Sequence, residues 1–165
     1  MLRSRPIRSL ALAAIPLGLM LASSPFASAD EHEMNEAQIG YRQKVMASVG
    51  ANMGAISDIL KNRLEVPGAI ANHATQMADA AALIAPAFRA EIAEGPTDAK
   101  PDIWTDWEGF EQAIAEYEAA ARALADAANG DDPAAVGPAM RTLGKSCGGC
   151  HRPFRKPKEE SFRNQ

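Results

Sequence analysis

The chain has 165 residues, a length that suits a single domain, and 23% of its residues are charged. It carries 17 Lys and Arg residues against 21 Asp and Glu residues, which gives a formal net charge of −4. An acidic surface of this kind argues against nucleic acid and anionic membranes as binding partners.

Residues 1–29 have the pattern of a secretory signal peptide. Three arginines precede an apolar run over residues 10–21, and a small-residue cleavage signal ends at Ala29. The run is too short to span a membrane and no stop-transfer pattern follows it, so we expect no stable membrane insertion. Cleavage before Asp30 would remove the three arginines and leave a mature chain with a net charge of −7. We therefore expect export to a bacterial periplasm.

Residues 35–61 predict a long amphipathic helix, because their apolar residues repeat at heptad spacing. The buried stripe of this helix would contain Ile39, Met46, Val49, Met53, Ile56 and Leu60. Arg42 falls on the same stripe, where a cation is costly unless it has an anionic partner or reaches solvent. Met46 lies one turn beyond Arg42, where a methionine either fills the core or offers its thioether to a metal.

A second helix is predicted by two heptad rows within residues 70–88. It would start near Pro67, and Pro86 should end or kink it because proline removes a backbone donor. Residues 91–101 contain the pairs Gly95-Pro96 and Lys100-Pro101, so we expect a loop there.

A third helix is predicted over residues 107–128, with Asn129 and Gly130 as its stop. Its apolar stripe consists of Trp107, Phe110, Ile114, Tyr117, Ala121, Leu124 and Ala128. Trp104 and the aromatic residues of the stripe could line a cofactor pocket, although core packing is the usual role of such residues.

The last helix is predicted to follow Asp132 and Pro133, which form an N-cap and a first-turn proline. Its buried stripe would contain Val136, Met140, Leu143, Cys147, Cys150 and Phe154. Pro153 should end or bend it. Residues 156–165 form a charged C-terminal tail that we expect to be mobile.

No segment shows the period-two alternation of a β-strand. Four amphipathic helices joined by short connections predict an all-α protein, an antiparallel four-helix bundle over residues 30–155. The core of such a bundle can hold a cofactor between facing helices.

Cys147-Gly148-Gly149-Cys150-His151 is the C-x-x-C-H arrangement of a c-type haem attachment site. Cys150 and His151 lie three and four residues after Cys147, so a helix would place all three side chains on one face. A thioredoxin-like thiol pair would be expected beside a βαβ pattern, which the sequence lacks. A structural zinc site usually has four protein ligands. The motif therefore favours one covalently bound haem c, whose propionate would be an anionic partner for Arg42.

Six basic residues surround this motif, and no acidic residue occurs in residues 133–158. They are Arg141, Lys145, Arg152, Arg155, Lys156 and Lys158. Such a cluster is typical of a solvated helix face and tail, and it could alternatively form a docking surface for an acidic partner.

Residues 41–46, 100–106 and 144–155 resemble the class II cytochromes c, the family of cytochrome c prime and its low-spin relatives. The resemblance extends over the mature chain to Arg155 and implies a haem-binding four-helix bundle. The site residues it implies are Cys147 and Cys150 as thioether attachments, His151 as the proximal iron ligand, Arg42 beside a haem propionate, and Gln43 in the same cofactor-binding segment.

Met46 matches the distal position of this family. In low-spin members a methionine there binds the iron, and in five-coordinate members the residue merely covers it. Pro153 and the tail after Arg155 depart from the family pattern, which usually continues the helix beyond the haem histidine with ordinary residues.

The resemblance implies a carrier of single electrons between periplasmic redox proteins. The alternative is a five-coordinate protein that binds nitric oxide or carbon monoxide. A thiol-disulfide enzyme that uses Cys147 and Cys150 would require that no haem is attached. No nucleotide loop, catalytic triad or carboxylate pair stands out, so we do not expect an enzyme. Members are often homodimers through their first two helices, which makes a homodimer a further expectation.

Overall fold

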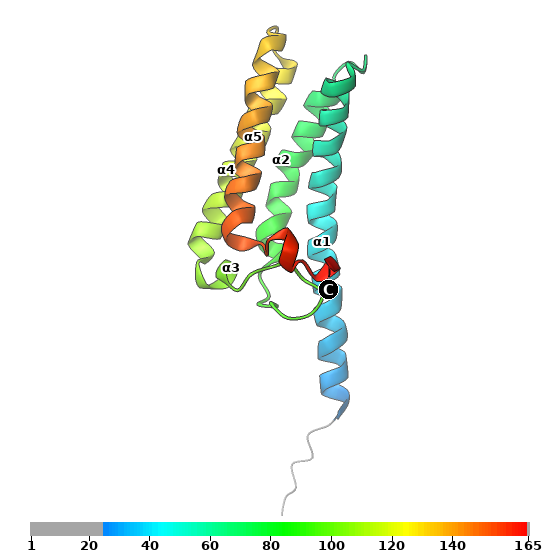
Figure 1. Cartoon of the computed structure of the whole chain (residues 1–165), viewed down its shortest axis with the longest axis vertical. Coiled ribbons are helices and arrows are strands. Elements are labelled where there is room, and N and C mark those ends of the chain that lie inside the picture. The colour runs from blue at the N-terminus through cyan, green and yellow to red at the C-terminus, as the bar shows by residue number, and fades with distance from the viewer. Residues whose placement is uncertain (1–24, 165) are drawn as a thin grey trace, which may run out of the picture.

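Four long helices run alternately up and down in the computed structural model, which describes residues 25–164 and the side chains of residues 30–164 (Figure 1). They are α1 (Pro25–Asn62), α2 (Ala69–Ala87), α4 (Trp107–Asn129) and α5 (Val136–Phe154). A single-turn helix, α3 (Asp102–Thr105), precedes α4. The predicted antiparallel four-helix bundle is confirmed.

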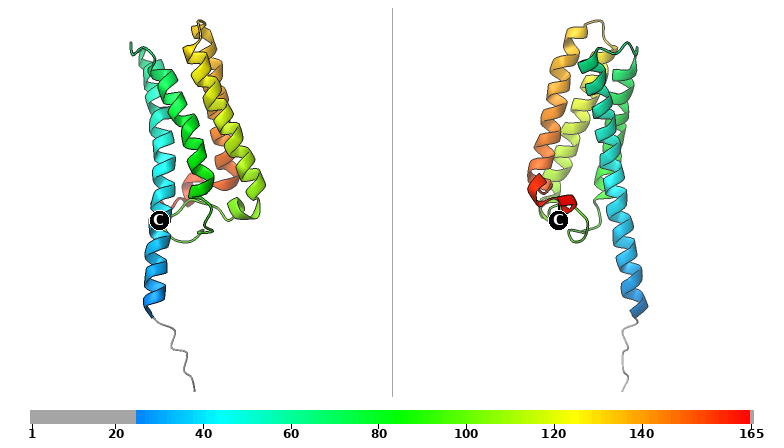
Figure 2. Two further views of the ribbon diagram at one scale, coloured as in Figure 1. Left: turned by 180° about the vertical axis from the view of Figure 1, so that it is seen from behind. Right: turned by 45° about the vertical axis from the view of Figure 1, so that its right-hand side comes forward.

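The helices pack in chain order around the bundle, but the ring does not close. α1 packs against α2, α2 against α4, and α4 against α5. Within the described residues, no Cα atom of α5 lies within 8 Å of one in α1. The bundle is therefore open along the side where α1 and α5 face each other (Figure 2).

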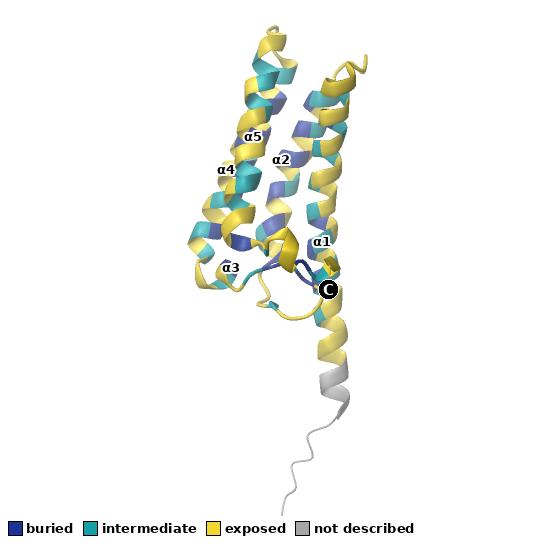
Figure 3. Ribbon diagram, viewed as in Figure 1, coloured by how far each residue is buried: buried dark blue, intermediate teal, exposed yellow. Residues whose placement is uncertain are grey.

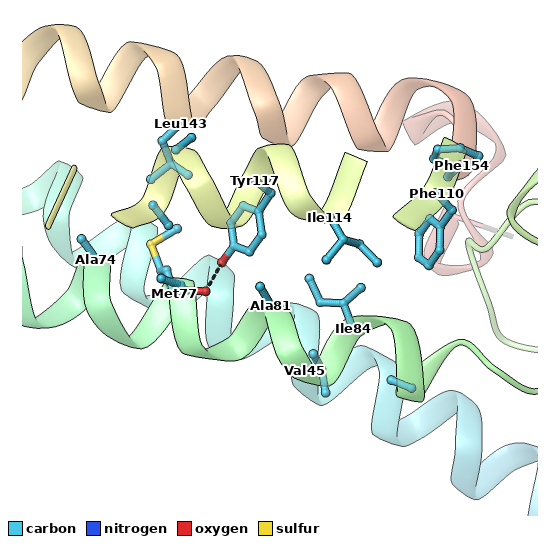
Figure 4. Close-up of a cluster of buried hydrophobic side chains, with 14 of the residues drawn as sticks. Val45, Ala74, Met77, Ala81, Ile84, Phe110, Ile114, Tyr117, Leu143 and Phe154 are labelled. Atoms are coloured by element: carbon cyan, nitrogen blue, oxygen red, sulfur yellow. Dashed lines mark hydrogen bonds between the residues drawn. The ribbon is translucent and has the colours of Figure 1, made fainter. Parts of the chain in front are cut away.

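The core lies between α2 and α4 and reaches α1 and α5 from there. Met77, Leu124 and Leu143 are fully buried within it, and burial of such a side chain stabilises the fold by roughly 1.5–3 kcal/mol. Tyr117 also lies inside, and its hydroxyl donates a hydrogen bond of 2.6 Å to the carbonyl oxygen of Met77 (Figure 4). Alanines at the buried face of α2, such as Ala81, let α4 approach closely.

Some helix ends follow the predicted signals, whereas the starts of α2 and α4 have signals that were not predicted. α2 starts after Gly68, whose φ of 72° is in the left-handed region that favours glycine. The Asp106 carboxylate accepts a hydrogen bond of 3.1 Å from the backbone N–H of Gly109 at the start of α4. Asp132 caps the short 3₁₀ turn Pro133–Ala135 that leads into α5. Pro86 and Pro153 each lie one residue before the end of their helix.

α1 begins ten residues before the predicted start at residue 35, because the preceding alanine, glutamate and methionine residues are good helix formers. Residues 30–34 of this extra length are exposed and lie beyond the bundle (Figure 3). The helix runs through the predicted cleavage site, and most of the predicted signal peptide, residues 1–24, lies outside the described residues. No helix in residues 25–164 is both long and apolar enough to cross a membrane.

The expectation of a mobile tail after Arg155 is wrong for residues 156–164. These residues form two short 3₁₀ turns, Lys158–Glu160 and Phe162–Asn164. The Lys156 N–H donates to the carbonyl oxygen of Asp98 at 2.8 Å, and Ser161 is buried. The tail therefore packs against the loop that precedes α3.

Candidate functional site

A cavity of about 560 Å³ lies on the open side of the bundle, with α1 as one wall and α5 as the other. The α1 wall includes Met46, Val49, Gly50 and Met53, and the α5 wall includes Gly144, Cys147, Cys150 and His151. Most of the lining is apolar, and the volume falls in the range of small-molecule and cofactor pockets. A Cβ atom added at Gly50 or Gly144 would have no neighbour within 4 Å, so both walls are recessed there.

The C-x-x-C-H motif forms part of the cavity wall. Cys147, Cys150 and His151 lie in the last two turns of α5 and all three line the cavity, as the helical spacing predicts. As a whole residue, His151 is exposed, and it also lines the hollow in the surface beside the cavity. Partial burial of the imidazole, followed by the positive charge of Arg155, lowers the pKa of His151. A neutral imidazole is the form that binds a metal.

The two thiols are free and partly buried in the described structure. Burial raises the pKa of the Cys147 thiol, and burial together with the charge on Cys147 raises the pKa of Cys150 to about 11. Thiols of disulfide oxidoreductases are activated by a lowered pKa instead. The electrostatics of the site therefore oppose the thiol-disulfide enzyme considered above.

Arg42 is only 2% exposed, so it does not reach solvent from the apolar stripe. Its Nε donates to the carbonyl oxygen of Ala87 at 3.0 Å, its Nη1 to that of Ile92 at 2.8 Å, and its Nη2 to that of Ala90. These carbonyls belong to the end of α2 and the loop beyond, where unpaired backbone acceptors attract a cation. The guanidinium carbon also lies 5.1 Å from the centre of the Phe88 ring.

Arg42 nevertheless lines the cavity, and each terminal nitrogen of its guanidinium keeps a second N–H. Gln43 lines the cavity beside it and donates from Nε2 to the carbonyl oxygen of Pro96 at 2.7 Å. A propionate site at Arg42 and Gln43 therefore stays a prediction, and backbone carbonyls hold both side chains in place.

Met46 is half-buried on the α1 wall of the cavity, while His151 is on the α5 wall. Met53 is a second methionine on the α1 wall, two turns further along the helix. The heptad pattern marked both as core positions and did not distinguish a core from a cavity, because the cavity replaces packed side chains at the same stripe.

Some of the aromatic residues line the cavity, and Trp104 contacts the residues around Arg42 instead. Phe110 and Tyr117 line the cavity. Trp104 instead donates from Nε1 to the carbonyl oxygen of Phe88 at 2.8 Å, and its ring faces the Arg42 guanidinium at 5.3 Å.

Among the cavity-lining residues that were not singled out from the sequence are Asp98, Phe162 and Arg163. They come from the loop before α3 and from the tail. No spacing signal links these two segments, and their contact depends on the tertiary fold.

Four of the six basic residues around the C-x-x-C-H motif line a hollow in the surface beside it. The hollow is lined by Arg152, Arg155, Lys156 and Lys158 together with Lys100 and Arg163. Arg141 and Lys145 lie earlier in α5 and do not line it.

Comparisons with known proteins agree with this arrangement. The family model described as Cytochrome C' matches residues 37–155. Cytochrome c' of Rhodospirillum rubrum is 38% identical over 122 residues, which is 72% of this chain and 82% of that protein. Cytochrome c-554 of Cereibacter sphaeroides is 32% identical over 157 residues, which is 92% of this chain and 98% of that protein. A nitric oxide complex of a cytochrome c prime mutant from Alcaligenes xylosoxidans is similar in structure, with a TM-score of 0.66 and 28% identity over 75% of this chain and 97% of that one.

Proposed function

Because the chain belongs to the cytochrome c' family, we propose that it carries single electrons between redox proteins in the periplasm. Its cofactor is one covalently bound haem c. When bound, this group supplies an iron that exchanges one electron between its ferrous and ferric forms. The proposal rests on one observation: Met46 of α1 and His151 of α5 line the same cavity.

The residues of the two walls have separate roles in this proposal. Cys147 and Cys150 would hold the cofactor by thioether bonds, and His151 would supply a nitrogen ligand to its iron. Met46 would supply a sulfur ligand, since Met and His together are a known ligand pair in cytochromes c and raise the reduction potential. Tyr117 is neutral at neutral pH, and burial raises its pKa further, so this lining residue adds no negative charge to the cavity.

Arg42 and Gln43 hold a propionate carboxylate with the N–H groups that the backbone carbonyls leave unused. Because those carbonyls already fix the Arg42 guanidinium, little side-chain freedom would be lost on contact. The end of α2 and the propionate would then share one buried cation.

The redox partner proposed for this chain is acidic at its docking face. The hollow beside His151 concentrates Arg152, Arg155 and Lys156, and positive potential near a redox centre steers acidic partners toward it. This role is that of a carrier and not of an enzyme.

A second function, binding of nitric oxide or carbon monoxide, is favoured by one observation. Met46 is half-buried beside a cavity with recessed walls, so a flexible side chain could cover the iron without binding it. The similar structure from Alcaligenes xylosoxidans is itself a nitric oxide complex.

Optical and electron paramagnetic resonance spectra of the purified holoprotein decide between these functions. For a carrier with Met46 as ligand, we expect low-spin iron that becomes high-spin on Met46→Ala and stays low-spin on Met53→Ala, the matched change on the same wall. A high-spin native protein that takes up carbon monoxide rapidly would refute the carrier mechanism and support gas binding. A change of spin state with Met53→Ala alone would move the ligand to that residue.

A further inference from the structure

The C-terminal tail closes part of the haem cavity, although the family match ends before it. That match covers residues 37–155, whereas Phe162 and Arg163 both line the cavity. In Figure 1 the tail, in red, crosses from the end of α5 toward α1 at the lower end of the bundle. This segment therefore adds a part of the site that the family match does not describe.

Asp98 holds the tail in this position. One carboxylate oxygen accepts the backbone N–H of Phe162 at 3.0 Å, and the other accepts the Ser161 hydroxyl at 3.0 Å and the Arg155 guanidinium at 3.3 Å. The Lys156 ammonium donates to the Thr97 carbonyl oxygen at 3.1 Å on the same loop. Arg163 is thus carried by a segment fixed at several points.

Three arginines line the cavity, and two of them already have partners. Arg42 donates to backbone carbonyls at the end of α2, and Arg155 pairs with Asp98. The Arg163 guanidinium lies 5.5 Å from the Phe162 ring centre, and no hydrogen bond or ion pair joins it to another residue within 30–164. Asp98 is the one acidic residue among the described lining residues, and its carboxylate accepts from the tail and from Arg155.

A haem bound in this cavity brings two propionate carboxylates, so the site must supply cations or solvent for both. We propose that Arg163 binds one haem propionate at the rim of the cavity, and that the tail serves as a clamp which carries it there. Arginine is suited to this role because its planar guanidinium can donate two parallel hydrogen bonds to a carboxylate. The inference rests on the attached haem and is independent of whether Met46 binds the iron.

The test compares the holoproteins of wild type, Arg163→Gln, Arg163→Lys and Lys158→Gln. Lys158→Gln removes the same charge from the same tail, but Lys158 lines the outer hollow and not the cavity. The readout is the reduction potential as a function of pH, measured by optical titration. A propionate that titrates makes the potential fall over a defined pH interval.

With Arg163→Gln we expect a lower potential and a shift of this pH interval upward by about one pH unit, because the carboxylate loses its cation. Arg163→Lys keeps the positive charge and should therefore show most of the wild-type behaviour, and Lys158→Gln should leave the interval at its wild-type pH. Equal behaviour of Arg163→Gln and Lys158→Gln would overturn the proposal and leave Arg163 as a solvated side chain. The spin state, which tests the proposed function, is read from the same samples and is unaffected by this outcome.

Discussion

Arg42 donates from Nε to the carbonyl oxygen of Ala87, 3.0 Å away, so a buried cation of α1 closes the end of α2. Arg42→Met should therefore lower the free energy of unfolding by about 3 kcal/mol, since it leaves buried carbonyls without their charged donor. Arg42→Lys should cost less, because an ammonium keeps the charge but reaches fewer of these acceptors. Denaturant unfolding of the holoprotein measures both changes.

Lys44→Met is the matched control, because it removes an exposed cation from the same helix. We expect a change within about 0.5 kcal/mol for this variant. If Arg42→Met were no more destabilising than Lys44→Met, the contacts of Arg42 with α2 would contribute nothing to stability and only the propionate role would remain.

The hydrogen bond from Tyr117 to Met77 gives the fold a dependence on alkaline pH. Burial, followed by the charge on Cys147, raises the pKa of Tyr117 above its ordinary value of 10.0. The unfolded phenol ionises near that value while the folded one does not, so stability is complete below pH 10 and falls as the pH rises above it. Tyr117→Phe should cost about 1 kcal/mol at pH 7 and remove this fall.

Urea unfolding at pH 7, 10 and 11 tests the Tyr117 prediction. Tyr41→Phe is the control, because Tyr41 is the other tyrosine of the chain and its side chain is exposed. A similar alkaline loss of stability in wild type and in Tyr117→Phe would show that the loss comes from other groups.

The hydrogen bonds between Asp98 and the C-terminal tail should break in acid. Burial alone would raise the pKa of Asp98, but hydrogen bonds from the Phe162 N–H, Ser161 and Arg155 outweigh it and lower the pKa below 3.8. The clamp therefore contributes its stability above pH 3.8 and loses it as the pH falls through the lower folded value. Asp98→Asn should loosen the tail even at pH 7.

Amide hydrogen exchange in residues 158–164 measures this opening directly, because local unfolding exposes these amides without unfolding the bundle. Glu159→Gln is the control, since it removes an exposed acid from the tail itself. Equal protection of the tail in Asp98→Asn and in wild type would exclude Asp98 as the residue that holds it.

The helices and the family were predictable because they depend on local signals. Heptad spacing and Gly130 placed α4 nearly to the residue, and the C-x-x-C-H spacing put Cys147 and His151 on one wall. Asp132 caps a 3₁₀ turn as predicted for a helix start, but α5 itself begins only after that turn. The family expected from the sequence is confirmed by the match over residues 37–155.

The partners of charged residues were not predictable from spacing. Arg42 contacts the carbonyl of Ile92, which lies 50 residues later, and Asp98 contacts Ser161, which lies 63 residues later. In both pairs at least one partner lies in an irregular loop. Composition alone made the tail look mobile, because a few hydrogen bonds to one distant carboxylate leave no pattern in a charged segment. These contacts exist only once the bundle brings the loop before α3 against the end of α5.

The basic hollow should govern the rate of electron exchange with anions. Arg152 is exposed at the hollow, next to His151, so Arg152→Glu should slow reduction of the anionic oxidant hexacyanoferrate(III) by roughly tenfold at low salt. Arg141→Glu makes the same charge change on the same helix but outside the hollow, and it should have a smaller effect. Stopped-flow rates at ionic strengths from 0.01 to about 0.5 M should converge for the two variants, since added salt shortens the Debye length. Equal slowing by both variants at every ionic strength would mean that net charge alone sets the rate, and the hollow would then have no part in docking.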